Sequence, residues 1–124
     1  MNSDKILKWI LIIGGVIEIV VGILFMFIHL FLEISGFSTI PIFTQFAGTL
    51  LFCFGILLII TAYDIERYVV IPLVNILLRV VMIVLAILNL SAYPDFFLIT
   101  LFAISYDITW AIIVLILLKK GKYL

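Results

Sequence analysis

Residues Gly14-Gly15-Val16-Ile17-Glu18-Ile19-Val20-Val21-Gly22 lie in the middle of a long apolar run that extends from Ile6 to Leu32. Glu18 is the only charged side chain in the central part of this run. Gly14, Glu18 and Gly22 are four residues apart, so on a helix they share one face. Because glycines at this spacing let a second helix approach closely, we expect the Glu18 carboxyl to meet a polar partner there.

The composition indicates that a lipid bilayer surrounds most of the chain. Of the 124 residues 68% are hydrophobic, and the mean hydropathy is +1.53. Soluble domains are roughly 45–50% apolar, and a fold of this length could not bury the excess. The zero net charge and the absence of a basic groove exclude nucleic acid as a partner. The single cysteine, Cys53, excludes an internal disulfide and CxxC chemistry.

Four apolar segments are each long enough to cross a bilayer, which takes about 20 residues. The first of them contains a charged residue and is longer than a signal-peptide core, so we interpret it as a retained membrane helix. The connections between segments are short, which makes successive helices antiparallel neighbours. The sequence therefore predicts an all-α membrane protein, a single domain over residues 1–124 that forms a four-transmembrane-helix antiparallel bundle. The expected spans are residues 6–32, 42–63, 70–90 and 96–118.

The basic residues predict the orientation of the bundle. Every Lys and Arg except Arg79 falls on one side of the expected membrane, and the opposite side has none. Cytoplasmic loops carry the excess of Lys and Arg, so both termini and the middle connection are expected in the cytoplasm. This predicts a multi-pass protein of the cell membrane. The residues that carry this argument are Lys5, Lys8, Arg67, Lys119, Lys120 and Lys122.

Three ionisable side chains lie deep inside the expected spans, and all three lie at one depth. Each is twelve or thirteen residues from a basic residue at the cytoplasmic end of its helix, which corresponds to about 18–20 Å. Scattered charges would have no reason to agree in this way. The intervals run from Lys5 to Glu18, from Arg67 to Arg79 and from Asp107 to Lys119.

The cost of burying these charges favours a shared network. A lone charge at the centre of a membrane helix costs about 2.5–3.5 kcal/mol. Arg79 offers five donors and keeps its charge, so we expect it to bridge Glu18 and Asp107, with Asn75 one turn away as a further polar neighbour. Two acids against one arginine leave a surplus negative charge. We expect one of the two carboxyls to hold a proton, and the sequence does not choose between them.

Two further groups of residues are expected to line the bundle. Glycines at helical spacing predict close helix packing in the first two spans, through Gly14, Gly22, Gly48 and Gly55. Polar residues near the outer ends of the spans predict a polar outer mouth, formed by His29, Gln45 and Asn89. A lone histidine without nearby cysteine or carboxylate spacing does not predict a metal site. No hydrolase, phosphate-binding or redox motif is present, which argues against an enzyme, and no cofactor is indicated.

The pattern resembles that of the small four-helix DoxX-like and BphX-like membrane protein families. The resemblance rests on Gly15 to Glu18 with Gly22 in the first helix, and on the Gly48 and Gly55 pair in the second. It further includes the turn Asp64-Ile65-Glu66-Arg67, the mid-helix Arg79 and the late Asp107. This resemblance implies a partner subunit of a quinone-linked oxidoreductase as one role. The chain is also similar to small multidrug-resistance transporters, which carry a first-helix glutamate followed by a glycine, here Glu18 and Gly22.

Three functions follow as alternatives. In the first, the layer of Glu18, Arg79 and Asp107 organises the bundle, either as a clamp alone or with a polar ligand or proton pocket. In the second, the chain is a proton-coupled small-molecule transporter that acts as a homodimer, with Glu18 as the carrier site. In the third, it is an accessory subunit of a larger membrane enzyme complex. The sequence gives no substrate, oligomeric state or protein partner.

Overall fold

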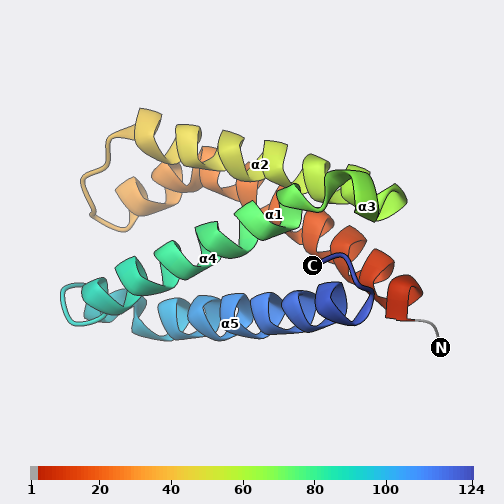
Figure 1. The fold of residues 1–124 in the computed structure, drawn as a ribbon. Helices are drawn as coiled ribbons and strands as arrows, with labels where there is room; N and C mark the ends of the chain where they lie inside the picture. Colours follow the sequence, from red (N-terminus) through yellow and green to blue (C-terminus); the bar gives the residue numbers. More distant parts are fainter. Residues whose placement is uncertain (1–2) are drawn as a thin grey trace. The chain divides into compact units, whose positions relative to one another are not determined.

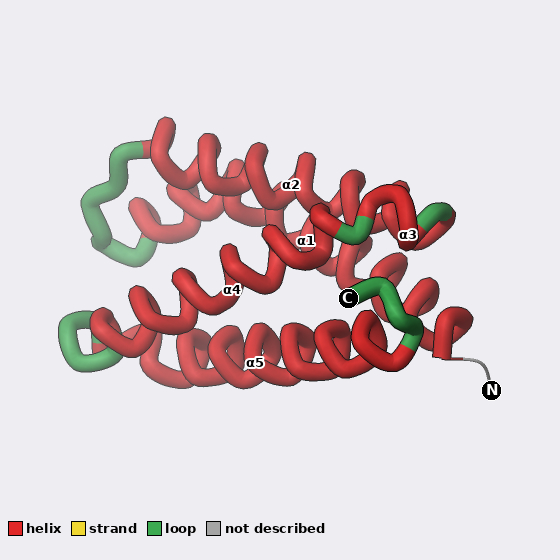
Figure 2. Tube along the Cα trace, in the orientation of Figure 1, coloured by secondary structure: helices red, strands yellow, loops and turns green. Residues whose placement is uncertain are grey.

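The computed structural model describes residues 3–124, and all regular structure in this range is helical. Four of the helices are long and apolar enough to cross a membrane, which makes the chain a small multi-pass membrane protein. Figures 1 and 2 show these helices and the short helix α3. A 3₁₀ turn, η1, leads into the last helix. The elements are α1 (Ser3–Ile34), α2 (Pro41–Tyr63), α3 (Ile65–Tyr68), α4 (Val70–Asn89), η1 (Pro94–Phe96) and α5 (Phe97–Lys120).

The ends of α1 differ from the expected span because local signals extend the helix beyond its apolar run. Asp4 lies in the first turn, where a negative charge is favourable. At the other end, the Phe37 N–H donates to the Leu32 carbonyl at 2.9 Å and the Gly36 N–H donates to the Glu33 carbonyl at 3.1 Å. Gly36 has a φ of +92°, which glycine adopts without a steric cost. This is a Schellman cap, and it ends α1 two residues later than hydropathy alone predicts.

The described residues form two compact units, and each is described by itself. One unit comprises residues 8–64, which hold α2 and nearly all of α1. The other comprises the first turn of α1, up to Leu7, and residues 65–124, which hold α3, α4, η1 and α5.

In the unit of residues 8–64, α1 and α2 touch through their backbones at two glycine pairs. A Cβ added to Gly22 would lie 2.6 Å from the Gly48 carbonyl oxygen, and one added to Gly55 would lie 2.5 Å from the Gly15 carbonyl oxygen. Real Cβ atoms do not come this close to backbone atoms. Gly15 of α1 meets Gly55 of α2, and Gly22, later on α1, meets Gly48, earlier on α2. The two helices therefore run in opposite directions. The glycines set the distance between the two helices.

Gly14 and Gly15 have different positions in the structure. Gly15 faces Gly55 on α2, whereas the spacing from Glu18 predicts that Gly14 makes this contact. Gly14 is buried on an adjacent part of the α1 surface. The contact with α2 therefore repeats every seven residues on each helix, at Gly15 and Gly22 on α1 and at Gly48 and Gly55 on α2.

In the other unit, α4 and α5 lie side by side and are joined by a short turn (Figure 1). The residues of α4 that are buried lie in its first half, and they are Pro72, Asn75 and Arg79. The buried residues of α5 recur at intervals of three, four and seven, which is the pattern of one helix face. They are Ile104, Trp110, Ala111, Val114 and Leu118. This packing places polar side chains of α4 opposite the middle of α5.

Candidate functional site

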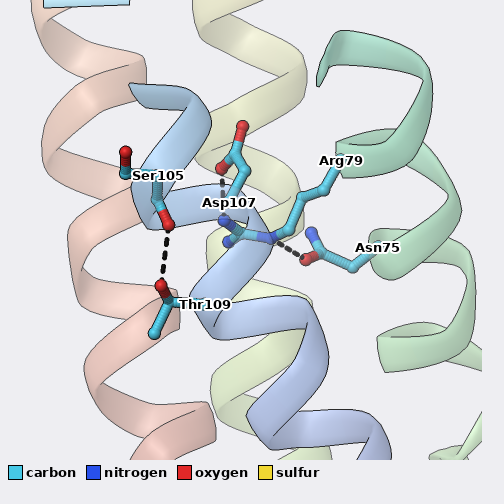
Figure 3. A network of polar contacts seen from close by, with 5 residues as sticks. All are labelled: Asn75, Arg79, Ser105, Asp107 and Thr109. Atoms are coloured by element: carbon cyan, nitrogen blue, oxygen red, sulfur yellow. Dashed lines mark hydrogen bonds and ion pairs between the residues drawn. The ribbon is translucent and has the colours of Figure 1, made fainter. Parts of the chain in front are cut away.

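The candidate site is built around Arg79, whose side chain is almost completely buried in the middle of α4. Arg79 is 4% exposed. Its Nη1 lies 2.7 Å from Oδ1 of Asp107 on α5, an ion pair that is also a hydrogen bond (Figure 3). Its Nε donates to Oδ1 of Asn75 at 2.8 Å, one turn earlier on α4. Asn75 has no exposed surface, so this contact is made away from lipid and water.

Asn75 orients the guanidinium group for its contact with α5. The four-residue spacing between Asn75 and Arg79 places both side chains on one face of α4. Because the Asn75 oxygen occupies the Nε edge of the planar guanidinium, the Nη1 edge is left to point at Asp107. The Asn75 side chain thus selects one direction for a cation that has five possible donors.

Two aromatic rings of α5 complete the surroundings of the cation. The guanidinium carbon of Arg79 lies 4.1 Å from the centre of the Trp110 ring and 5.3 Å from that of the Tyr106 ring. Both distances are within the range of cation–π attraction, which is about 6 Å. Tyr106, Asp107 and Trp110 share one face of α5 because they are spaced one, three and four residues apart. We name these residues, with Arg79 and Asn75, the arginine cluster.

The polar side chains beside the arginine cluster on α5 do not belong to it. Ser105 and Thr109 are exposed, and the Thr109 hydroxyl donates to the Ser105 carbonyl at 2.8 Å (Figure 3). A hydroxyl that is satisfied within its own helix can face lipid at low cost. Asp107 is the more accessible partner in the ion pair, since its side chain is 24% exposed against 5% for Arg79.

Glu18 is buried on α1, in the unit of residues 8–64. It is 6% exposed, and it lies between the two glycines of α1 that contact α2, three residues after Gly15 and four before Gly22. A carboxyl so completely removed from solvent needs polar surroundings, whichever protonation state it holds.

The residues expected at the outer mouth have different environments. Gln45 is exposed on α2. Asn89 is exposed on α4, and its side-chain amide donates to the Leu85 carbonyl of the same helix at 2.7 Å. His29 is half-buried on α1, and its Nδ1 is buried with no hydrogen-bond partner among residues 3–124. Over the same residues, no three His, Cys, Asp or Glu side chains gather closely enough to hold a metal ion.

A second polar contact joins the two ends of the chain within one unit. The last residues fold back through a Schellman cap, in which the Tyr123 N–H donates to the Leu118 carbonyl at 3.0 Å. Partial burial, a hydrogen bond to the Asp4 carboxylate and the negative charges of Asp4 and Glu66 raise the pKa of the Tyr123 phenol above its ordinary value of 10.0. The tail of the chain lies close to the first turn of α1, since a Cβ added to Gly121 would lie 2.9 Å from Oδ1 of Asp4.

Sequence reasoning missed Tyr106 and the contact between Tyr123 and Asp4. The signal for Tyr106 was available, because it precedes Trp110 by one helical turn on the face that carries Asp107. The contact of the tail has no such signal, since it depends on the path of the chain after α5. Comparison of the chain with protein-family models, with curated proteins and with solved structures finds no match.

Proposed function

We propose that this protein is a four-span antiparallel membrane bundle with cytoplasmic termini, in which the arginine cluster locks the helices in register. The observation that carries the proposal is the complete engagement of a buried cation. Arg79 is 4% exposed and meets an amide, a carboxylate and two aromatic rings. Such a set of contacts fixes the relative position of α4 and α5 along their length.

The energy of the ion pair supports a structural role. Within the hydrocarbon region no water is present to solvate a charge that loses its partner. Removing one partner of a buried ion pair costs about 3–5 kcal/mol, because the other charge is left uncompensated. Sliding α4 along α5 would separate Arg79 from Asp107 and carry this cost. Apolar side chains resist such sliding far less, since lipid can replace each apolar contact.

Glu18 is included in this proposal as a third member of the charged layer. Its support is the burial of its carboxyl and its depth, which matches those of Arg79 and Asp107 when counted along the sequence. With Glu18 present, the layer holds two carboxyls and one cation, and one proton restores neutrality.

The test compares single and combined substitutions in purified protein. Arg79→Met should lower the free energy of unfolding by about 3–5 kcal/mol, because it leaves a buried carboxylate. The triple variant Glu18→Gln, Arg79→Met, Asp107→Asn removes all the charges and retains hydrogen-bonding groups, so it should recover much of this loss. Thermal unfolding in detergent measures both effects. Arg67→Met is the matched control, since Arg67 is exposed in the connection between α2 and α4.

Each comparison has a result that contradicts the proposal. A triple variant no more stable than Arg79→Met would show that the three residues do not form one network. A double variant, Arg79→Met with Asp107→Asn, separates the contribution of Glu18. If this double variant is already as stable as the triple variant, Glu18 does not belong to the layer.

The burial of Glu18 also favours a second function, proton-coupled transport by a homodimer. A buried carboxyl within a membrane span is the usual site of a proton relay. In that case Glu18→Gln alone should abolish proton-linked uptake into proteoliposomes while thermal stability changes little. A clamp predicts that Glu18→Gln preserves both function and thermal stability, since an amide can replace the hydrogen bonds of a protonated carboxyl.

A further inference from the structure

Trp110 carries a buried polar group that the arginine cluster does not use. Its side chain is 6% exposed, and Nε1 is buried with no hydrogen-bond partner among residues 3–124. An indole nitrogen is a donor only, so it can be satisfied by nothing but an acceptor. A buried donor without an acceptor costs about 1–3 kcal/mol. Native proteins rarely keep such a group unless a water molecule or ligand completes it.

The surroundings of Trp110 specify what could complete the indole N–H. The face of the ring is occupied by the guanidinium of Arg79, at 4.1 Å, and Arg79 has only donors to offer. Oδ1 of Asp107 is engaged by Nη1 of Arg79. The missing partner therefore bears a lone pair, and the nearby cation favours a partial negative charge. A metal ion is excluded, because a protonated indole nitrogen has no lone pair to give.

The position of Trp110 along α5 further limits which acceptors can reach its indole N–H. Trp110 is the fourteenth residue of a helix of 24 residues, ten residues before its end at Lys120. At 1.5 Å per residue this is about 15 Å from the helix end, which is near the middle of a bilayer core of about 30 Å. Phospholipid carbonyls lie at the interface and do not reach this depth.

We propose that Nε1 of Trp110 is a binding site for an oxygen acceptor that is not part of the chain, either a buried water molecule or the carbonyl oxygen of a small membrane-soluble compound. The proposal depends on the position of Trp110 in the arginine cluster. It does not depend on the cluster acting as a clamp, so the stability measurements above and the measurement below can fail separately.

The experiment uses the fact that the chain has only two tryptophans. Trp9 is 54% exposed, so Trp9→Phe leaves Trp110 as the single indole and should preserve the fold. Nitrogen-15-labelled tryptophan in this variant, held in nanodiscs, gives one indole N–H signal. We expect a proton shift typical of a hydrogen-bonded indole. Magnetisation transfer from water identifies a water molecule as the acceptor. A shift that changes after detergent delipidation identifies a bound compound, which mass spectrometry of the extract then detects.

Two results would overturn the proposal. The first is an indole proton with the shift of a non-bonded N–H, unaffected by water or delipidation. The second is a bonded proton that responds to neither treatment, which would assign the acceptor to the chain itself.

Trp110→Phe provides an independent check, because it keeps an aromatic face for Arg79 and removes the donor. Native mass spectrometry should then show loss of the bound compound from Trp110→Phe and its retention in Trp9→Phe.

Discussion

At the scale of single residues, the identity of Arg79 decides what the interior of this protein can be. A lysine at this position could lose its proton on burial, whereas arginine remains a cation and offers a planar set of donors. Asn75 and Asp107 accept hydrogen bonds from two of its nitrogens, and the rings of Trp110 and Tyr106 lie within cation–π distance of it. The pairing of Arg79 with Asp107 could be predicted, because the two residues lie at the same depth along their helices. The position of Tyr106 on the face that carries Asp107 could also be predicted, but its contact with Arg79 could not, because aromatic residues are equally common on lipid-facing surfaces.

The Tyr123 phenol makes stability depend on pH in the alkaline range. Its pKa is raised in the folded chain above the ordinary value of 10.0. The contribution of this group is therefore complete below pH 10 and is lost as the pH rises through the folded pKa, because ionisation then requires release from Asp4. Tyr123→Phe should make thermal stability less sensitive to pH in this interval.

The matched control for this prediction is Tyr93→Phe, since Tyr93 is 57% exposed and precedes α5, at the opposite end of that helix from Tyr123. Asp4→Asn should lower the pKa of Tyr123, which the absorbance of the phenolate measures during an alkaline titration. An unchanged titration in Asp4→Asn would show that the tail is not attached to the first turn of α1.

At the scale of helices, the sequence predicts which long helices are present better than it predicts the residues at which they end. Each of the four long helices is present within a few residues of its expected span, because 18 or more apolar residues in lipid must satisfy their backbone groups internally. The short helix α3 was not predicted. The charged side chains of Asp64, Glu66 and Arg67 in this connection indicate a solvated turn. Ile65, however, is only 8% exposed, and its burial packs the segment onto the unit of residues 65–124.

The glycine contact between α1 and α2 should tolerate no added carbon atom. In Gly22→Ala the new Cβ would lie 2.6 Å from the Gly48 carbonyl oxygen and 2.7 Å from the Phe52 nitrogen, and neither backbone atom can move alone. We expect a loss of about 1–3 kcal/mol, the usual effect of overpacking, measured by thermal unfolding in detergent. Leu24→Ala is the control, since Leu24 is 61% exposed on the same helix. Equal melting temperatures for the two variants would contradict this account of the contact.

At the scale of the whole molecule, the membrane environment follows from composition, and orientation is a separate prediction from charge. Four candidate spans are present in the described chain, and every Lys and Arg except Arg79 lies near an end of a span or in a connection. Charge asymmetry predicts sidedness because basic loops stay in the cytoplasm. Composition cannot predict which helix faces meet, since Leu, Ile, Val and Phe serve equally well against lipid and against another helix.

Cysteine labelling in intact cells tests the orientation. The exposed native Cys53 is first replaced in Cys53→Ala so that it does not react. In that background, a membrane-impermeant reagent should label Ser38→Cys and Ser91→Cys, and should label Ser3→Cys and Lys122→Cys only after the cells are opened. Labelling of the two terminal positions in intact cells would reverse the proposed orientation.

The pairing of Arg79 with Asp107 also has a consequence for how the protein is made. The two residues are 28 positions apart, so the ribosome adds Asp107 after Arg79 with a delay of about 1–6 s at ~5–20 residues per second. During this delay α4 carries an arginine that opposes entry into lipid by about 2.5–3.5 kcal/mol. We therefore expect α4 to wait beside the translocon until α5 arrives, and the two helices to enter the bilayer together as a hairpin. A nascent chain that stops after α4 should be released into the membrane poorly, and Arg79→Leu should correct that defect.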